Sequence, residues 1–211
     1  MVFPIYDYRS DQRNVVITPQ IRSRFLSLQP TKDTGNGHTH DVGHEVFIVM
    51  EGEVTFEIGE DVAVLSKGQM CVAMAGIMHN VYVSGNEPAI IYLSVTPHVQ
   101  PTHTTWDSEG NKLPPMFQPV GNYDEPVDQT ELDSLIDRYI QTIGRIGEID
   151  TDKHCKLVEG LKIALINRDN IATNQARNDM GQDISIIYQQ IITLTDIWNV
   201  LTARSVDIAS D

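Results

Sequence analysis

The segment Gly37-His38-Thr39-His40-Asp41-Val42-Gly43-His44-Glu45 decides how the rest of this sequence is interpreted. Side chains alternate between the two faces of an extended strand, so His38 and His40 would point to the same side. Glu45 lies just past a turn and His79 belongs to a later strand, so both can converge on that side. Three imidazole nitrogens and one carboxylate oxygen form a ligand set that suits a first-row divalent metal. We therefore predict a metal site built on β-strands.

Short strand-like segments separated by turn signals lie on both sides of this segment. Residues 46–50 are rich in β-branched side chains and end at Glu51-Gly52-Glu53, which is typical of a tight turn. Residues 54–58 then alternate between apolar and polar side chains, as a half-buried strand does. Many short strands at regular spacing indicate a sandwich or a barrel. The expected strands cover residues 14–17, 24–28, 46–50, 54–58, 62–65, 71–74, 80–83 and 90–95.

The sequence changes character after the last expected strand. Six prolines fall between residues 96 and 126, which favours an extended arm over a regular element. The arm also carries Trp106, Phe117 and Tyr123, and a free linker would rarely contain such side chains. We therefore expect residues 1–120 to form the barrel, with a proline-rich arm at about 97–126 docked on its surface.

From residue 128 onward the hydrophobic period becomes helical. Apolar side chains recur at i, i+3, i+4 and i+7, which is the spacing of one helix face. We expect Asp128 and Glu131 to cap the first helix, a second helix to begin near residue 150, and a third to cover about 182–203. Residues 127–211 would thus form a helical extension of about three helices. The apolar stripe from Ile184 to Leu201 on the third helix is expected to pack on the barrel or across a homodimer.

The balance of charges excludes several kinds of partner. The chain has 29 acidic and 15 basic residues, a net charge of −14, and such a surface repels nucleic-acid phosphates and anionic lipid. The N-terminus lacks the pattern of a signal peptide, and no stretch approaches 18 consecutive apolar residues. Cys71 and Cys155, the only cysteines, lie in segments that favour free thiols. We expect a cytoplasmic protein that binds neither nucleic acid nor a membrane.

Two motifs resemble the signatures of the cupin superfamily over roughly residues 20 to 100. The first joins a glycine-rich turn to His-x-His-x4-Glu-x6-Gly, and the second is Gly-x10-His with an internal glycine. Two positions depart from the pattern: Lys32 stands where the leading glycine is usual, and Met74 replaces a proline. The matching residues are Gly35 or Gly37, His38, His40, Glu45 and Gly52 in the first motif, and Gly68, Gly76 and His79 in the second.

The resemblance implies a mainly β fold, a double-stranded β-helix or jelly-roll cupin barrel, followed here by the α-helical extension. It also implies that His38, His40, Glu45 and His79 hold a divalent transition metal, which could be Fe, Mn, Ni or Zn. His44 competes with its neighbour Glu45, but alternation turns it to the opposite face of the strand. A barrel without a metal, whose polar groups line a ligand pocket, is the alternative.

Three further residues are candidates for the pocket. His98 and His103 follow the last expected strand, where they can line the pocket mouth as acid or base groups. Histidines in a proline-rich arm also commonly do no more than bond to the protein surface. Tyr92 lies on the last strand and is a candidate for the pocket wall rather than for catalysis.

Two classes of function fit these residues. The first is a metal-dependent enzyme acting on a small organic molecule, most simply a dioxygenase in which Glu45 accepts a proton. An isomerase or lyase would use the same metal as a Lewis acid. The second is a non-catalytic module that binds a metabolite or metal. No helix-turn-helix with basic recognition residues is visible, which disfavours a DNA-binding regulator, and a storage role does not require this ligand set.

Overall fold

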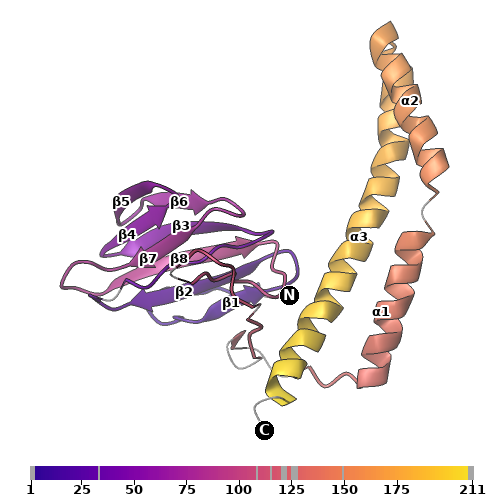
Figure 1. Ribbon diagram of the computed structural model, residues 1–211. Coiled ribbons are helices and arrows are strands. Elements are labelled where there is room, and N and C mark those ends of the chain that lie inside the picture. The colour runs from indigo at the N-terminus through magenta and orange to yellow at the C-terminus, as the bar shows by residue number, and fades with distance from the viewer. Residues whose placement is uncertain are drawn as a thin grey trace. The chain divides into compact units, whose positions relative to one another are not determined.

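The computed structural model describes residues 3–32, 34–107, 109–114, 116–119, 123–124, 128–148 and 150–208. Within these residues, eight β-strands precede three helices along the chain (Figure 1). The chain divides into two compact units, Met1–Asp128 with Asn199–Asp211, and Gln129–Trp198. The predicted β-barrel followed by C-terminal helices is therefore confirmed. Parts of the expected proline-rich arm, including residues 120–122 and 125–127, lie outside the described residues.

The strands form two antiparallel sheets. The larger sheet has the order β1-β2-β8-β3-β6, and the smaller has the order β5-β4-β7. The last strand, β8, pairs with β2 on one side and β3 on the other, so it lies between two strands that come much earlier in the sequence. The strands are β1 (Asn14–Ile17), β2 (Arg22–Leu28), β3 (His44–Glu51), β4 (Glu53–Ile58), β5 (Asp61–Ser66), β6 (Met70–Ala73), β7 (His79–Tyr82) and β8 (Ala89–Thr96).

The core lies between the two sheets. Phe47 on β3 and Phe56 on β4 are fully buried, and their ring centroids lie 5.2 Å apart. Ile91 on β8 of the larger sheet and Val54 on β4 of the smaller sheet belong to the same buried cluster. Each such side chain contributes about 1.5–3 kcal/mol by leaving water. This packing holds the two sheets against each other, and it fixes the strands that carry the predicted ligands Glu45 and His79.

The docked arm was expected, and its first part pairs with the segment of the metal motif. Thr39 and Thr104 exchange backbone hydrogen bonds of 2.9 and 2.8 Å. The side-chain amide of Asn199 also binds the arm. Its Oδ1 accepts a hydrogen bond from Gln100 N, and its Nδ2 donates one to His98 O, both at 2.9 Å. The arm is therefore tied at two points within its unit.

Helix ends differ from the expected ones in two places. Helix α1 (Leu132–Gly147) follows Glu131, which makes no side-chain cap hydrogen bond, so the expected cap is wrong. Asp128 instead accepts hydrogen bonds from the Arg204 guanidinium through its backbone and side-chain oxygens. Helix α2 (Thr151–Asn167) begins as expected, because Asp150 Oδ1 accepts from Lys153 N at 2.9 Å.

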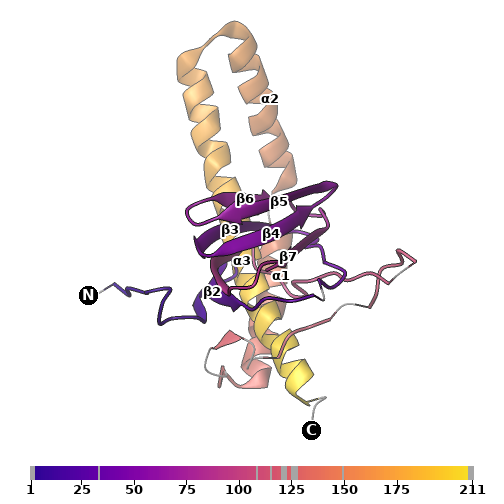
Figure 2. The same cartoon turned by 90° about the vertical axis from the view of Figure 1, so that its left-hand side faces the viewer.

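Helix α3 (Asn170–Ile208) begins earlier than the expected residue 182. Asp169 provides the start signal, because its Oδ1 accepts from the backbone N–H groups of Ile171 and Ala172, each at 3.0 Å. In both views α2 lies alongside the first half of α3, where His154 Nδ1 is 3.3 Å from Asp183 Oδ2 (Figures 1 and 2). None of the described helices has the length and apolar character needed to cross a bilayer.

Candidate metal centre

Gly37 allows two of the predicted ligands, His38 and His79, to lie next to each other. His38 and His79 form an antiparallel bridge, in which each backbone N–H donates to the other residue's carbonyl at 2.9 Å. Gly37 has a φ of +71°, and a Cβ built there would lie 2.7 Å from His79 O. Only glycine accepts both this conformation and this contact without strain. The glycine-rich turn therefore sets the approach of the two histidines.

The strand register of β3 supplies the carboxylate. Glu45, Phe47 and Val49 alternate inward and are buried, whereas His44 is exposed. The Nδ1 of His44 accepts the N–H of Ala75 at 2.8 Å, outside the cluster. Of the two neighbouring candidates, Glu45 is thus the one that the structure brings to the histidines.

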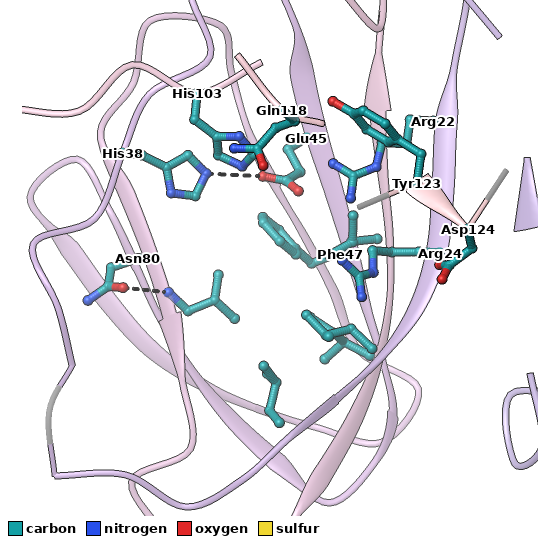
Figure 3. A pocket seen from close by; sticks show the side chains of 15 residues that line it. Arg22, Arg24, His38, Glu45, Phe47, Asn80, His103, Gln118, Tyr123 and Asp124 are labelled. Carbon is teal, nitrogen blue, oxygen red and sulfur yellow. Dashed lines mark hydrogen bonds and ion pairs between the residues drawn. The ribbon is translucent and has the colours of Figure 1, made fainter. Parts of the chain in front are cut away.

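The four predicted ligands lie together, with one ligand atom of each within 4.8 Å of the others. Glu45 Oε2 is 2.8 Å from His40 Nε2, 3.0 Å from His79 Nε2 and 3.9 Å from His38 Nε2. His40, Glu45 and His79 are buried, and His38 is partly buried. These contacts make Glu45 the centre of the cluster. Figure 3 shows its contact with His38.

Backbone carbonyls orient two of the imidazoles. His79 Nδ1 donates to Ile77 O at 2.9 Å, and His40 Nδ1 donates to Thr102 O. An imidazole that uses its Nδ1 proton in this way presents the lone pair of Nε2. Both lone pairs then face a carboxylate oxygen, so a shared proton or a cation has to lie between them. His38 Nε2 is buried and has no hydrogen-bond partner among the described residues. This donor set fits a divalent transition metal.

The ionisation of the cluster suits metal ligands. Burial, together with neighbouring His103 and His79, lowers the pKa of His38 to about 3, which keeps it neutral. Burial alone would raise the pKa of Glu45, but the contacts with His40 and His79 outweigh it and lower that pKa. Burial opposes charge on His79, yet its bond to Glu45 raises its pKa overall. A metal would displace the proton that this pair shares.

His103 is a fourth histidine beside the three of the cluster. Its ring centroid lies 4.4 Å from that of His38 and 5.0 Å from that of His40. Its Nδ1 is 2.8 Å from Thr102 Oγ1. Burial and the neighbouring His40 lower the pKa of His103 to about 4. The structure therefore places this arm histidine on the wall of the cavity that His38 and Glu45 also line.

The other two pocket candidates lie elsewhere. Tyr92 is on the face of β8 opposite Ile91 and Leu93, where its hydroxyl is 2.9 Å from Ser23 Oγ and its ring packs on Phe25. The alternation of β8 thus removes Tyr92 from the cavity wall. His98 is buried against Tyr123, with ring centroids 5.4 Å apart, and does not line the cavity either. Neither residue lines this cavity, and a pocket role for either stays a prediction.

A cavity of about 640 Å³ opens beside the cluster (Figure 3). His38, Glu45 and His103 contribute to its polar part. No separate signal in the sequence pointed to Gln118 and Tyr123, which the arm brings to the wall. Arg22 and Arg24 could have been found by alternation, because they share one face of β2 with Leu26 and Leu28. The complete lining consists of Arg22, Arg24, Leu26, Leu28, His38, Glu45, Phe47, Asn80, Val81, Ile91, Leu93, His103, Gln118, Tyr123 and Asp124.

Comparison with known families agrees with this architecture. Residues 24–96 match the model of the cupin domain family, and they contain β3 to β8 with all four clustered residues. The resemblance to cupins is therefore confirmed for the barrel, whose His/Glu cluster is a possible metal site. The helices lie outside the matched range, and no curated protein matches the chain.

Many solved structures are similar to part of the chain. TT1209 from Thermus thermophilus is 27% identical over 40% of this chain and 80% of its own, with a TM-score of 0.38. An uncharacterized protein with a double-stranded β-helix domain from Klebsiella pneumoniae is 24% identical over 46% and 91%, with a TM-score of 0.41. A Cupin 2 conserved barrel domain protein from Salinispora arenicola is 15% identical over 46% and 88%, with a TM-score of 0.37.

Proposed function

We propose that this chain is a metal-dependent cupin enzyme acting on a small organic molecule, most simply a dioxygenase. The observation that carries the proposal is the convergence of His38, His40 and His79 on Glu45 at the wall of a cavity of about 640 Å³. Such a volume suits a small molecule. A divalent transition metal held by these four residues would supply Lewis-acid or one-electron chemistry at positions that the protein leaves open.

The residues of the chain would position the substrate and move its protons. Glu45 Oε2 lies at the centre of the cluster, so its carboxylate can accept a proton from a substrate bound beside it. His103 has a pKa lowered to about 4, chiefly by burial, and is therefore neutral at pH 7 and able to accept a proton. Phe47, Ile91 and Leu93 line the apolar part of the cavity and exclude water from that part.

The cytoplasmic location expected from the sequence belongs to this proposal. The described cysteines, Cys71 and Cys155, are both free thiols, which is compatible with a reducing compartment.

The first experiment measures the metal content of untagged protein purified without chelator. We expect about one transition metal per chain, lost in His79→Ala because that variant removes a ligand at the centre of the site. His44→Ala is the matched control, since His44 lies next to Glu45 but outside the cluster. Absence of metal in the wild type, even after reconstitution with Fe(II), Mn(II), Ni(II) and Zn(II), would contradict the proposal.

Activity then separates the possible reactions. O2 consumption by the metal-loaded protein with a panel of small organic substrates is the result expected for a dioxygenase. Turnover without O2 uptake would point to an isomerase or lyase that uses the metal as a Lewis acid. Ligand-dependent stabilisation without any turnover would indicate a binding module instead.

A further inference from the structure

Two arginines line the cavity in addition to the polar side chains of the His/Glu cluster. The alternation of β2 turns Arg22 and Arg24 to the cavity, and the same face continues as Leu26 and Leu28. One wall of the cavity is therefore cationic over its first part and apolar over the next. Figure 3 shows Arg22 between Glu45 and Tyr123, and Arg24 on the side of Asp124.

Arg22 is buried, and a hydrogen bond and an aromatic ring hold its side chain in place. Its side chain is 7% exposed, its Nε donates to Asn14 Oδ1 at 2.9 Å, and its guanidinium lies 5.2 Å from the centroid of the Tyr123 ring. No carboxylate among the described residues forms an ion pair with it. A buried guanidinium without a paired anion is costly, and a ligand that supplies the anion would compensate for that cost.

Arg24 is half-buried, unlike Arg22, but it too has an unpaired polar group. Its Nε is buried and has no hydrogen-bond partner in the described part of the chain. Asp124 also lines the cavity, but it is exposed, and its Oδ2 accepts from the backbone and side-chain nitrogens of Asn14 at 3.0 and 3.1 Å. Arg24 and Asp124 form no ion pair within 4.0 Å. A donor is therefore available to a ligand in the cavity.

The charge of the cavity agrees with an anionic occupant. The chain as a whole carries a net charge of −14, so two inward guanidinium groups are a local exception. Glu45 is the buried carboxylate nearest to the cluster histidines, and a bound divalent metal would more than neutralise it. The remaining carboxylate of the lining, Asp124, is exposed and forms no ion pair with either arginine, so the inner part of the cavity would attract an anion.

We propose that Arg22 and Arg24 bind the anionic group of a small organic acid, whose apolar body lies along Leu26 and Leu28. Guanidinium groups recognise carboxylates and phosphates alike through charge-assisted hydrogen bonds. The assignment of this acid as the substrate rests on the proposed function. The anion subsite itself does not require catalysis or a metal.

Binding of three matched probes tests the subsite by isothermal titration calorimetry. Hexanoate carries a carboxylate, butyl phosphate carries a phosphate, and 1-hexanol is the neutral control. We expect one or both anions to bind the wild-type protein at least about tenfold more tightly than 1-hexanol, as loss of a charge-assisted hydrogen bond would predict. The better anion identifies the group that the arginines prefer. Equal binding of all three probes would overturn the proposal.

Substitutions of Arg24 test whether this residue contributes to the affinity for the anion. Arg24→Gln should weaken binding of the better anion about tenfold or more, and Arg24→Lys should recover part of it. Arg9→Gln is the matched control, because Arg9 is exposed and pairs with Asp7 away from the cavity. An unchanged anion affinity in a folded Arg24→Gln variant would overturn the proposal. If that variant fails to fold, the comparison of probes on the wild type still decides.

The titrations are repeated on chelator-treated and on Zn(II)-loaded protein. Anion binding that depends on Arg24 in the chelator-treated protein supports the subsite even if no metal or turnover is found, in which case only the proposed function fails. Anion binding that appears only with Zn(II) and is unaffected by Arg24→Gln reflects coordination by the metal alone, and it would overturn the subsite.

Discussion

At the scale of single residues, the members of the His/Glu cluster follow from the sequence, but their surroundings do not. His38, His40, Glu45 and His79 stand at spacings that specify alternation on strands, and a strand fixes the direction of each side chain. His98 and His103 lie in a proline-rich arm, which has no such period. Only the backbone pairing of Thr39 with Thr104 brings His103 to the cluster and leaves His98 outside the cavity.

Gly37 should be essential to the metal site. In Gly37→Ala the new Cβ would meet His79 O, and the positive φ would cost about 1–2 kcal/mol in addition. We expect lower stability to urea and reduced metal content. Gly35→Ala is the control, because Gly35 has a similar φ of +68° but its added Cβ meets no described atom within 4 Å. Equal losses in the two variants would show that the contact with His79 is unimportant.

His98 should make the protein sensitive to acid. Burial lowers its pKa to about 4, so between roughly pH 6.5 and pH 4 the unfolded state binds more protons than the folded state. Stability therefore falls as the pH falls through this window, by up to about 3 kcal/mol for a shift of this size. In chelator-treated protein, urea unfolding of His98→Gln should lose less stability between pH 7 and pH 4 than the wild type. An identical pH dependence would contradict this assignment.

At the scale of elements, strands were easier to predict than helices. Each expected strand is present with ends shifted by two residues at most, because turn signals such as Glu51-Gly52-Glu53 bound a clear alternation. Helix α3 begins at Asn170, where exposed polar residues hide the apolar period and only the Asp169 cap marks the start. The inward arginines of β2 do not stand out in the sequence, because Arg22 lies before the expected strand at residues 24–28 and Arg24 is its first residue.

Asn199 should stabilise the arm through the end of α3. Its amide makes two hydrogen bonds, with Gln100 N and His98 O. Asn199→Ala removes both, so we expect a loss of about 1–3 kcal/mol in the free energy of unfolding. The control is Asn174→Ala, an exposed asparagine of the same helix whose side chain accepts from Arg177 at 2.9 Å. The two variants would lose equal stability if the arm did not depend on this anchor.

At the scale of the whole molecule, the helical unit has no part in the matched cupin range and exposes apolar side chains of its own. On α1 the exposed residues recur at i, i+4 and i+8, which places them along one side of the helix. Such a face usually needs a partner. The exposed apolar residues of α1 are Leu132, Ile136, Ile140 and Ile143.

The sequence led us to expect a homodimer, and we predict that this face of α1 contributes to it. Light scattering coupled to size exclusion should give the wild-type protein twice the mass of one chain. Ile140→Asp places a charge in the middle of the face, and burying it unpaired would cost several kcal/mol, so this variant should elute as a monomer. Gln141→Asp adds the same charge at the next, exposed position of α1 and should leave the dimer intact. A monomeric wild type, or a dimer unaffected by Ile140→Asp, would show that this face has another role.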